Sequence, residues 1–133
     1  MAEADIDTIR ASYAAVNRGD VHGALDALHR DAVWRESAEL PGGDEFEGRE
    51  AIEGFLDGFL EQWELFHQQV ESTVRSGDRV LVNIHLTAVG RESGAEVNAR
   101  YAHLWTMRDG RGVAVDGYYD PEKALRALEA SED

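Results

Sequence analysis

The sequence predicts one α+β domain in which most helices come first and a meander of antiparallel strands follows. Apolar residues recur every three or four positions over much of the chain up to Trp63, as on the buried face of a helix. From Phe66 to Tyr119 they alternate with polar residues, as in strands with one buried face. A chain of 133 residues fits a single domain, residues 1–133, with a core large enough to enclose a pocket.

Three helices are predicted before the meander. The first covers residues 6–16 and ends at Gly19. Asp20 is placed to cap a second, shorter helix, whose apolar face includes Leu28 and which ends by Asp31. The third follows Gly48 and has the strongest helical pattern of the chain. We expect its apolar stripe to be buried; the stripe consists of Ile52, Phe55, Leu56, Phe59, Leu60 and Trp63.

The remaining elements follow from alternation and turn signals. A short strand at 32–36 puts Trp34 and Glu36 on one face, and residues 37–47, with Pro41, are predicted as a loop that forms a rim or lid. The meandering strands are expected at 66–74, 79–89, 97–107 and 113–119. A terminal helix begins with Asp120 as N-cap and Pro121 as its first residue.

Composition excludes several classes of function. The net charge of −14 repels nucleic acid and anionic membrane surfaces. No apolar run is long enough to span a membrane and no signal peptide is visible, so we expect a cytoplasmic protein. Without cysteine there is no thiolate site, and the histidines lack metal-ligand spacing. No glycine-rich nucleotide motif occurs, so we expect neither metal nor cofactor.

The predicted strand at 97–107 carries an ionisable group on its apolar side. His103 alternates with Tyr101 and Trp105 on one face, while Arg100 lies on the other. Burying an imidazole is costly unless the ring is neutral and hydrogen-bonded. Either a structural partner or a chemical task must therefore explain His103.

An ordered set of short motifs resembles the SnoaL-like branch of the nuclear transport factor 2-like (NTF2-like) superfamily. The motifs are Gly19-Asp20, Trp34, residues 46–52 (FEGREAI), His103-Leu104-Trp105 and Asp109-Gly110. The resemblance implies a cone in which three N-terminal helices pack on a curved mixed sheet around an internal pocket. It also implies homodimers through the outer sheet face. Members include ketosteroid isomerases, polyketide cyclases, epoxide hydrolases and dehydratases, besides binding domains without catalysis.

By its resemblance to the ketosteroid isomerase pattern, Glu36 falls at the general base and His103 at the oxyanion-hole acid. Phe55 and Tyr119 fall at pocket aromatics. The tyrosine of the first helix falls at Ser12, and Tyr13 is turned by about 100° from that position. The missing tyrosine and the histidine in place of an aspartic acid argue against steroid isomerisation. The epoxide hydrolase pattern is absent too, because its arginine would have to be Arg100, on the other face.

Two functions remain open from the residues. In the first, Glu36 is a base whose pKa is raised by an apolar pocket, and His103 is an acid or oxyanion donor. The chain would then be a cofactor-independent isomerase, cyclase or dehydratase for a small, mostly apolar carbonyl compound. The expected substrate-binding walls are Trp34, Phe55, Phe59, Tyr101, Trp105 and Tyr119.

In the second, Glu36 points to solvent and His103 is a core histidine bonded to a tyrosine hydroxyl or a backbone carbonyl. The domain would then bind a small hydrophobic molecule or a partner without catalysis. Self-association is a further possibility. It would use an outer sheet face that carries Leu81, Asn83, His85, Arg100 and Leu104.

Overall fold

The computed structural model describes residues 2–36 and 44–130. Their elements follow the predicted order of helices and then strands. They are α1 (Ala2–Asn17), α2 (Val21–Ala24), a 3₁₀ helix η1 (Leu25–Ala27), β1 (Leu28–Arg35), β2 (Glu45–Glu47), α3 (Arg49–Leu60), β3 (Trp63–Ser76), β4 (Arg79–Gly90), β5 (Glu96–Arg108), β6 (Arg111–Tyr118) and α4 (Pro121–Ala130). No helix among these is long and apolar enough to cross a membrane.

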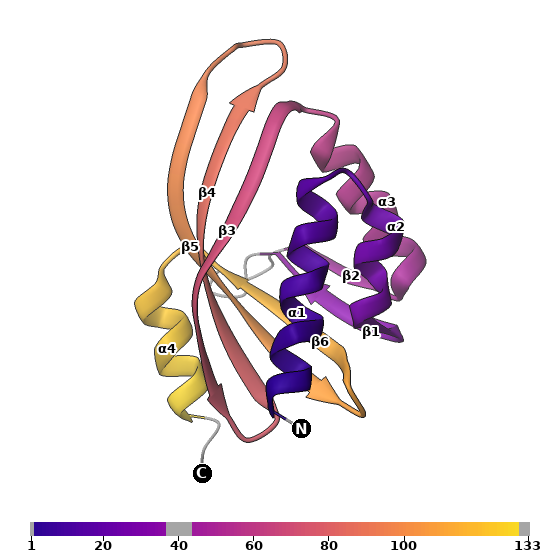
Figure 1. Ribbon diagram of the computed structural model, residues 1–133, viewed down its shortest axis with the longest axis vertical. Helices are drawn as coiled ribbons and strands as arrows, with labels where there is room; N and C mark the ends of the chain where they lie inside the picture. The colour runs from indigo at the N-terminus through magenta and orange to yellow at the C-terminus, as the bar shows by residue number, and fades with distance from the viewer. Residues whose placement is uncertain (1, 37–43, 131–133) are drawn as a thin grey trace.

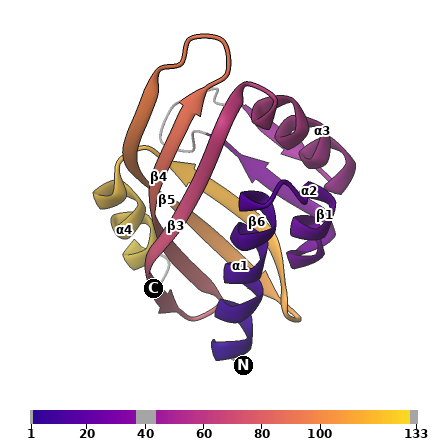
Figure 2. The same cartoon turned by 45° about the horizontal axis from the view of Figure 1, so that its top comes forward.

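The strands form one strongly curved mixed sheet in the order β2-β1-β6-β5-β4-β3 (Figure 1). Strands β3 to β6 are an antiparallel meander, β1 pairs in parallel with β6, and β2 pairs antiparallel with β1. Helices α1 to α3 lie on the concave side and α4 lies on the convex side (Figure 2). The predicted α+β fold with three N-terminal helices on a curved mixed sheet is confirmed, and α4 is the fourth helix.

The main core lies between the concave face and the N-terminal helices. Ile9 and Tyr13 of α1 pack with Ile52 of α3 and with Val82 and Trp105 of the sheet. Gly112 of β6 makes room for this packing, because a Cβ there would lie 2.7 Å from the Trp105 ring. Burial of these side chains supplies most of the driving force that holds helices and sheet together.

Helix α1 is fixed to the free edge of the sheet by side-chain contacts with β3. The Asn17 amide donates to the Gln68 carbonyl oxygen and accepts from the Gln68 backbone N–H, each at 2.8 Å. The amide thus bonds to β3 as a neighbouring strand would. Nearer the start of α1, Arg75 donates to the buried Asp5 carboxylate at 3.2 Å.

Helix α4 covers part of the convex face. Its Ala124 and Leu128 pack on Leu81, Ala102 and Leu104, which are all buried. The expectation that Leu81 and Leu104 face a second copy of the chain is therefore wrong, because a helix that follows the sheet in the same chain already covers them.

The convex face beyond α4 is polar. His85 bonds to Asn98 at 2.6 Å, and Arg100 donates to Glu71 at 3.0 Å. His85 and Arg100 thus lie on the outer face, as predicted. Pairing of two copies through this face stays a prediction.

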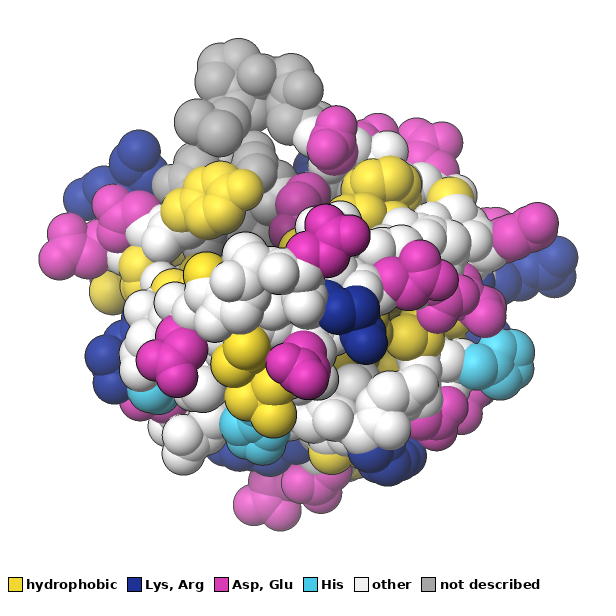
Figure 3. Space-filling view, turned by 90° about the horizontal axis from the view of Figure 1, so that it is seen from above, with side chains coloured by type: hydrophobic (Ala, Val, Ile, Leu, Met, Phe, Trp, Pro, Cys, Tyr) yellow, Lys and Arg dark blue, Asp and Glu magenta, His cyan; other side chains and the backbone are white. Residues whose placement is uncertain are grey.

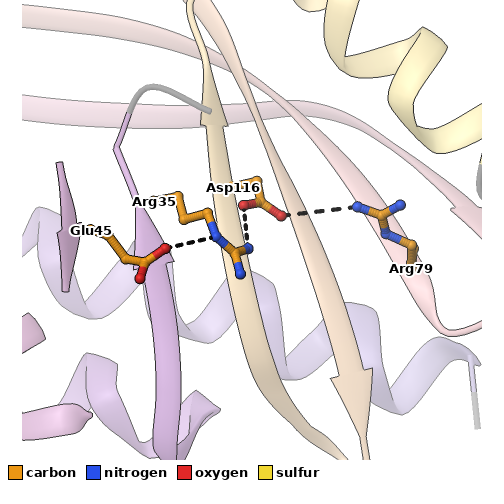
Figure 4. Close-up of polar contacts among 4 residues, drawn as sticks. All are labelled: Arg35, Glu45, Arg79 and Asp116. Atoms are coloured by element: carbon orange, nitrogen blue, oxygen red, sulfur yellow. Dashed lines mark hydrogen bonds and ion pairs between the residues drawn. The ribbon is translucent and has the colours of Figure 1, made fainter. Parts of the chain in front are cut away.

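A series of ion pairs links four strands on the convex face, opposite the helices α1 to α3 (Figure 4). Arg35 of β1 donates to Glu45 of β2 at 3.1 Å and to Asp116 of β6 at 2.7 Å. Arg79 of β4 lies 3.9 Å from the second oxygen of Asp116. Asp116 is buried, and its hydrogen bond with Arg35 raises the pKa of Arg35. Charges on both sides of Asp116 compensate its loss of water.

At three places a residue or segment belongs to another kind of element than the sequence predicted. Leu28 begins β1 instead of closing the second helix, because it pairs with Gly112 of β6. Trp63 begins β3 instead of ending the third helix, because it pairs with Gly90 of β4. Residues 45–47 form β2 and are not loop. The rest of the predicted lid, except Asp44, lies outside the described residues.

We predict that Leu104→Ala lowers the free energy of unfolding by about 3 kcal/mol, because it leaves a cavity under α4 where Leu104 is 0% exposed. Urea unfolding followed by circular dichroism measures this loss. Leu125→Ala is the matched control on α4 itself: Leu125 is 40% exposed, and its truncation should cost less than about 1 kcal/mol. Equal losses in the two variants would contradict the assignment of the buried face.

Candidate functional site

A cavity of about 310 Å³ lies between the concave face of the sheet and the N-terminal helices. Every residue that the sequence proposed for the site lines it. These residues are Trp34, Glu36, Phe55, Phe59, Tyr101, His103, Trp105 and Tyr119. Tyr119 is 63% exposed, so it stands at the rim. The structure brings the predicted set together, while the role of each residue stays a prediction.

Helix α3 supplies one aromatic wall. Phe55 stacks on Phe46 of β2 with ring centroids 4.4 Å apart, and Phe59 contacts Phe55 at 6.0 Å. We expected the stripe of α3 to be buried, but only Ile52 is; Phe55 and Phe59 are half-buried because they face the cavity. The predicted helix is confirmed, and part of its apolar stripe lines the cavity.

Glu36 directly follows β1 and lies over β6. A Cβ at Gly117 would come within 2.6 Å of the Glu36 carbonyl oxygen, so a glycine in β6 permits this approach. The Trp34 indole donates to Glu36 Oε2 at 2.6 Å. Burial raises the pKa of Glu36; the Trp34 hydrogen bond lowers it, and the charge of Asp44 raises it further. Glu36 is half-buried at the cavity and is not a solvent-facing strand end.

His103 lies on β5 among aromatic rings and is 7% exposed. Its Nδ1 lies 2.6 Å from the Tyr13 hydroxyl, and its ring stacks between Tyr13 and Tyr101, with Trp34 edge-on at 5.3 Å. Burial lowers the pKa of His103 to about 4, so the imidazole is neutral at pH 7. His103 is thus a core histidine bonded to a tyrosine hydroxyl, as the second alternative expected, and it also lines the cavity. Its role as an acid or oxyanion donor stays a prediction.

The contact that Tyr13 makes was not predicted from the sequence. The resemblance to ketosteroid isomerases put Ser12 at the site position of the first helix, with Tyr13 turned away from it. Both residues line the cavity, but the Ser12 hydroxyl donates to the Ala24 carbonyl at 2.9 Å, while the Tyr13 hydroxyl reaches His103. Burial raises the pKa of Tyr13 well above its usual value, so the phenol stays protonated. The spacing of Ile9 and Tyr13 on one helical face was the signal that could have found it.

Gln68 is a second cavity residue that was not predicted from the sequence. Its side-chain amide donates to the Tyr101 hydroxyl inside the cavity. Burial raises the pKa of Tyr101 to about 12. Alternation along β3 puts Phe66, Gln68 and Val70 on one face, so the polar residue in an apolar series was the available signal.

The cavity holds one acidic side chain and no inward cation among the described residues that line it. The only basic one, Arg100, donates to Glu71 on the outer face instead. Outside, acidic side chains are spread over the face seen in Figure 3, in line with a net charge of −14. No group of three His, Asp or Glu side chains in residues 2–36 and 44–130 is placed to hold a metal ion. This interior suits ligands without negative charge.

Comparisons with known proteins identify related folds. Residues 9–115 match the family model of the SnoaL-like domain. A search of curated proteins finds no match. An NTF2-like protein of unknown function from Burkholderia pseudomallei has a TM-score of 0.77 at 22% identity, with 94% of this chain and 97% of that chain covered. TerC, co-crystallised with polyporic acid, has a TM-score of 0.77 at 26% identity, with coverage of 94% and 97%.

A third solved structure is described by the activity proposed for that protein. A candidate SnoaL-like polyketide cyclase from Jannaschia has a TM-score of 0.78 at 18% identity, with 96% of this chain and 93% of that chain covered. Because these likenesses extend over almost all of the chain, the fold is NTF2-like.

We predict that His103 makes the protein less stable as the pH falls. Between about pH 6.5 and pH 4 the unfolded chain binds a proton at His103 that the folded chain does not, so the free energy of unfolding falls as pH falls. From pH 7 to pH 5 this loss is about 2 kcal/mol. Urea unfolding at the two pH values measures it, and His103→Gln should lack it.

Glu36 has the opposite effect in the same experiment. Its raised pKa makes the folded chain bind a proton more readily than the unfolded chain, so its share of the stability grows as pH falls. Glu36→Gln should therefore lose more stability on acidification than the wild type.

For His103, an identical pH dependence of the free energy of unfolding in the wild type and in His103→Gln would contradict the buried neutral imidazole.

Proposed function

The chain belongs to the SnoaL-like domain family, and from that premise we propose a cofactor-independent enzyme that moves protons on a small, mostly apolar carbonyl compound. The observation that carries the proposal is the single cavity that holds the Glu36 carboxyl, the His103 imidazole and the Tyr101 hydroxyl between aromatic walls. The raised pKa of Glu36 brings the carboxyl toward the range of a general base at neutral pH.

In the proposed reaction Glu36 removes a proton from the carbon next to the carbonyl group. The electron pair of the broken C–H bond forms an enolate, whose oxygen becomes negative. His103 and Tyr101 donate hydrogen bonds to that oxygen from neighbouring positions on β5. The protonated Glu36 then returns the proton to another carbon, which completes an isomerisation, or to a leaving hydroxyl, which departs as water.

Isomerisation is the preferred form of this chemistry. A histidine with a pKa of about 4 carries no extra proton at pH 7, and the tyrosines keep theirs. Glu36 is therefore the group that can both take and return a proton. A dehydration or cyclisation that needs a second proton donor besides Glu36 is less favoured, because His103 and Tyr101 do not give up a proton at neutral pH.

The alternative is a domain that binds a hydrophobic ligand without turnover. The hydrogen bond that occupies His103 Nδ1 favours it, because such a bond alone explains a buried histidine. That TerC was co-crystallised with polyporic acid supports a small-molecule role of either kind.

We predict that the wild type catalyses exchange of deuterium from solvent into the carbon next to the carbonyl of a neutral ketone. Proton NMR of a panel of cyclic and linear ketones measures the exchange without knowledge of the natural product. Glu36→Gln and His103→Phe should each slow it by about 100-fold or more, because one removes the base and the other a donor to the oxyanion.

The control is Glu47→Gln, which makes the same change at an exposed position on β2 and should exchange at the wild-type rate. Melting temperatures of the three variants separate lost chemistry from lost structure. Exchange at an undiminished rate in Glu36→Gln would refute the proposed base. Ligand binding without exchange in the wild type would favour the binding domain.

We predict that a ligand with a carboxylate binds about tenfold more weakly than its methyl ester, or worse. A second negative charge in the cavity would meet Glu36 and no inward cation. Quenching of tryptophan fluorescence reports binding, because Trp34 and Trp105 line the cavity. The gap should narrow in Glu36→Gln. Tighter binding of the carboxylate would contradict this preference.

A further inference from the structure

Three buried side chains form a chain of hydrogen bonds beside the cavity. The Trp105 indole nitrogen Nε1 lies 3.0 Å from the Tyr13 hydroxyl oxygen, and that oxygen lies 2.6 Å from His103 Nδ1. The three residues come from α1 and β5, so this series of hydrogen bonds exists only in the folded protein. Each is less than one-tenth exposed.

The direction of these bonds follows from the donors. An indole N–H can only donate, so the Tyr13 oxygen accepts from Trp105. Among the described residues, His103 Nδ1 is then the acceptor left for the Tyr13 proton. If Nδ1 carried the ring proton, two donors would point at the Tyr13 oxygen and the phenol proton would be buried without an acceptor. Tyr13 therefore donates to an unprotonated Nδ1.

The other ring nitrogen must carry the proton of a neutral imidazole. A neutral histidine holds one ring proton, so an unprotonated Nδ1 puts it on Nε2. Among the described residues no hydrogen-bond partner is assigned to Nε2, while the residue lines the cavity. Stacking on Tyr13 and Tyr101, at ring-centroid distances of 5.8 and 5.3 Å, fixes the plane of the ring.

We propose that Tyr13 is a positioning residue: it holds His103 in the tautomer with its proton on Nε2, so that the ring offers the cavity a fixed N–H donor. Trp105 assists by occupying the Tyr13 oxygen. The catalytic consequence, donation to an oxyanion, rests on the proposed function. The tautomer itself does not.

The surroundings keep this donor neutral. The ionisable side chains that line the cavity with His103 come from several elements: Tyr13 from α1, Glu36 after β1, Arg100 and Tyr101 from β5, Tyr118 from β6, and Tyr119 just after it. Arg100 is paired with Glu71 outside, and the raised pKa values of Tyr13 and Tyr101 keep these two phenols protonated. Glu36 accepts a hydrogen bond from Trp34 at Oε2, and no direct contact between Glu36 and the imidazole is present among the described residues. The imidazole is therefore a hydrogen-bond donor that keeps its proton, and it is neither a general acid nor a base.

The test is the tautomer of His103 in the protein without ligand. Long-range ¹H–¹⁵N NMR distinguishes a protonated ring nitrogen from one with a free lone pair, and the signals of His103 are those absent from His103→Gln. We expect a protonated Nε2 and an unprotonated Nδ1 that do not change from pH 5.5 to 8.5. A proton on Nδ1, or titration of His103 in this range, overturns the proposal.

Tyr13→Phe and Tyr101→Phe form a matched pair of variants. Each removes one hydroxyl from a ring stacked on His103, but only Tyr13 bonds to the imidazole. In Tyr13→Phe the Nδ1 signal should move toward the protonated position, by at least about three times the shift seen in Tyr101→Phe. Equal shifts in the two variants overturn the positioning role.

The exchange assay then reports the consequence for turnover. Tyr13→Phe should lower kcat by about tenfold and leave KM unchanged, because the donor is misplaced for part of the time while the walls are intact. An unchanged kcat in an active enzyme overturns the catalytic consequence. Absence of exchange in the wild type counts against the proposed function and leaves the NMR result to decide the tautomer.

Discussion

A single hydrogen bond, from Tyr13 on the first helix to His103 in the middle of the sheet, is the contact on which the rest of the site depends. An imidazole buried among aromatic rings must be neutral, and it must have a partner for the nitrogen that does not face the ligand. Tyr13 is that partner, 90 positions away in the chain. The same bond therefore joins α1 to β5 and determines that Nε2, and not Nδ1, of the imidazole is available to the cavity.

Contacts on the convex face of the sheet stabilise it, while the concave face leaves room for the cavity. On the convex side, α4 and the ion pairs around Asp116 hold the strands together without any help from the cavity. On the concave side, α3 can then leave Phe55 and Phe59 only half-covered. Two glycines in β6 permit close approaches beside the cavity, since Gly112 makes room for the Trp105 ring and Gly117 makes room for the backbone of Glu36.

Much of this arrangement follows from local patterns. Alternation along β5 identified the face with Tyr101, His103 and Trp105. The short strand predicted at 32–36, together with the family resemblance, pointed to Glu36. What failed depended on contacts between distant segments. Pairing with β6 and β4 moved Leu28 and Trp63 into strands, and α4 covered Leu104, which alternation alone assigned to an outer face. The spacing of Ile9 and Tyr13 marks the inward face of α1, but that Tyr13 meets His103 depends on how α1 sits against β5, which the sequence of the helix alone does not determine.

The contact between Asn17 and Gln68 has a consequence for how the protein behaves at high concentration. β3 is an edge strand of 14 residues, and an open edge of that length is a template on which a strand of another molecule can add. The amide of Asn17 occupies the outward N–H and C=O of Gln68 near the middle of that edge. A foreign strand would find the ladder interrupted there, so the residue that anchors the first helix also protects the molecule against amyloid-like growth.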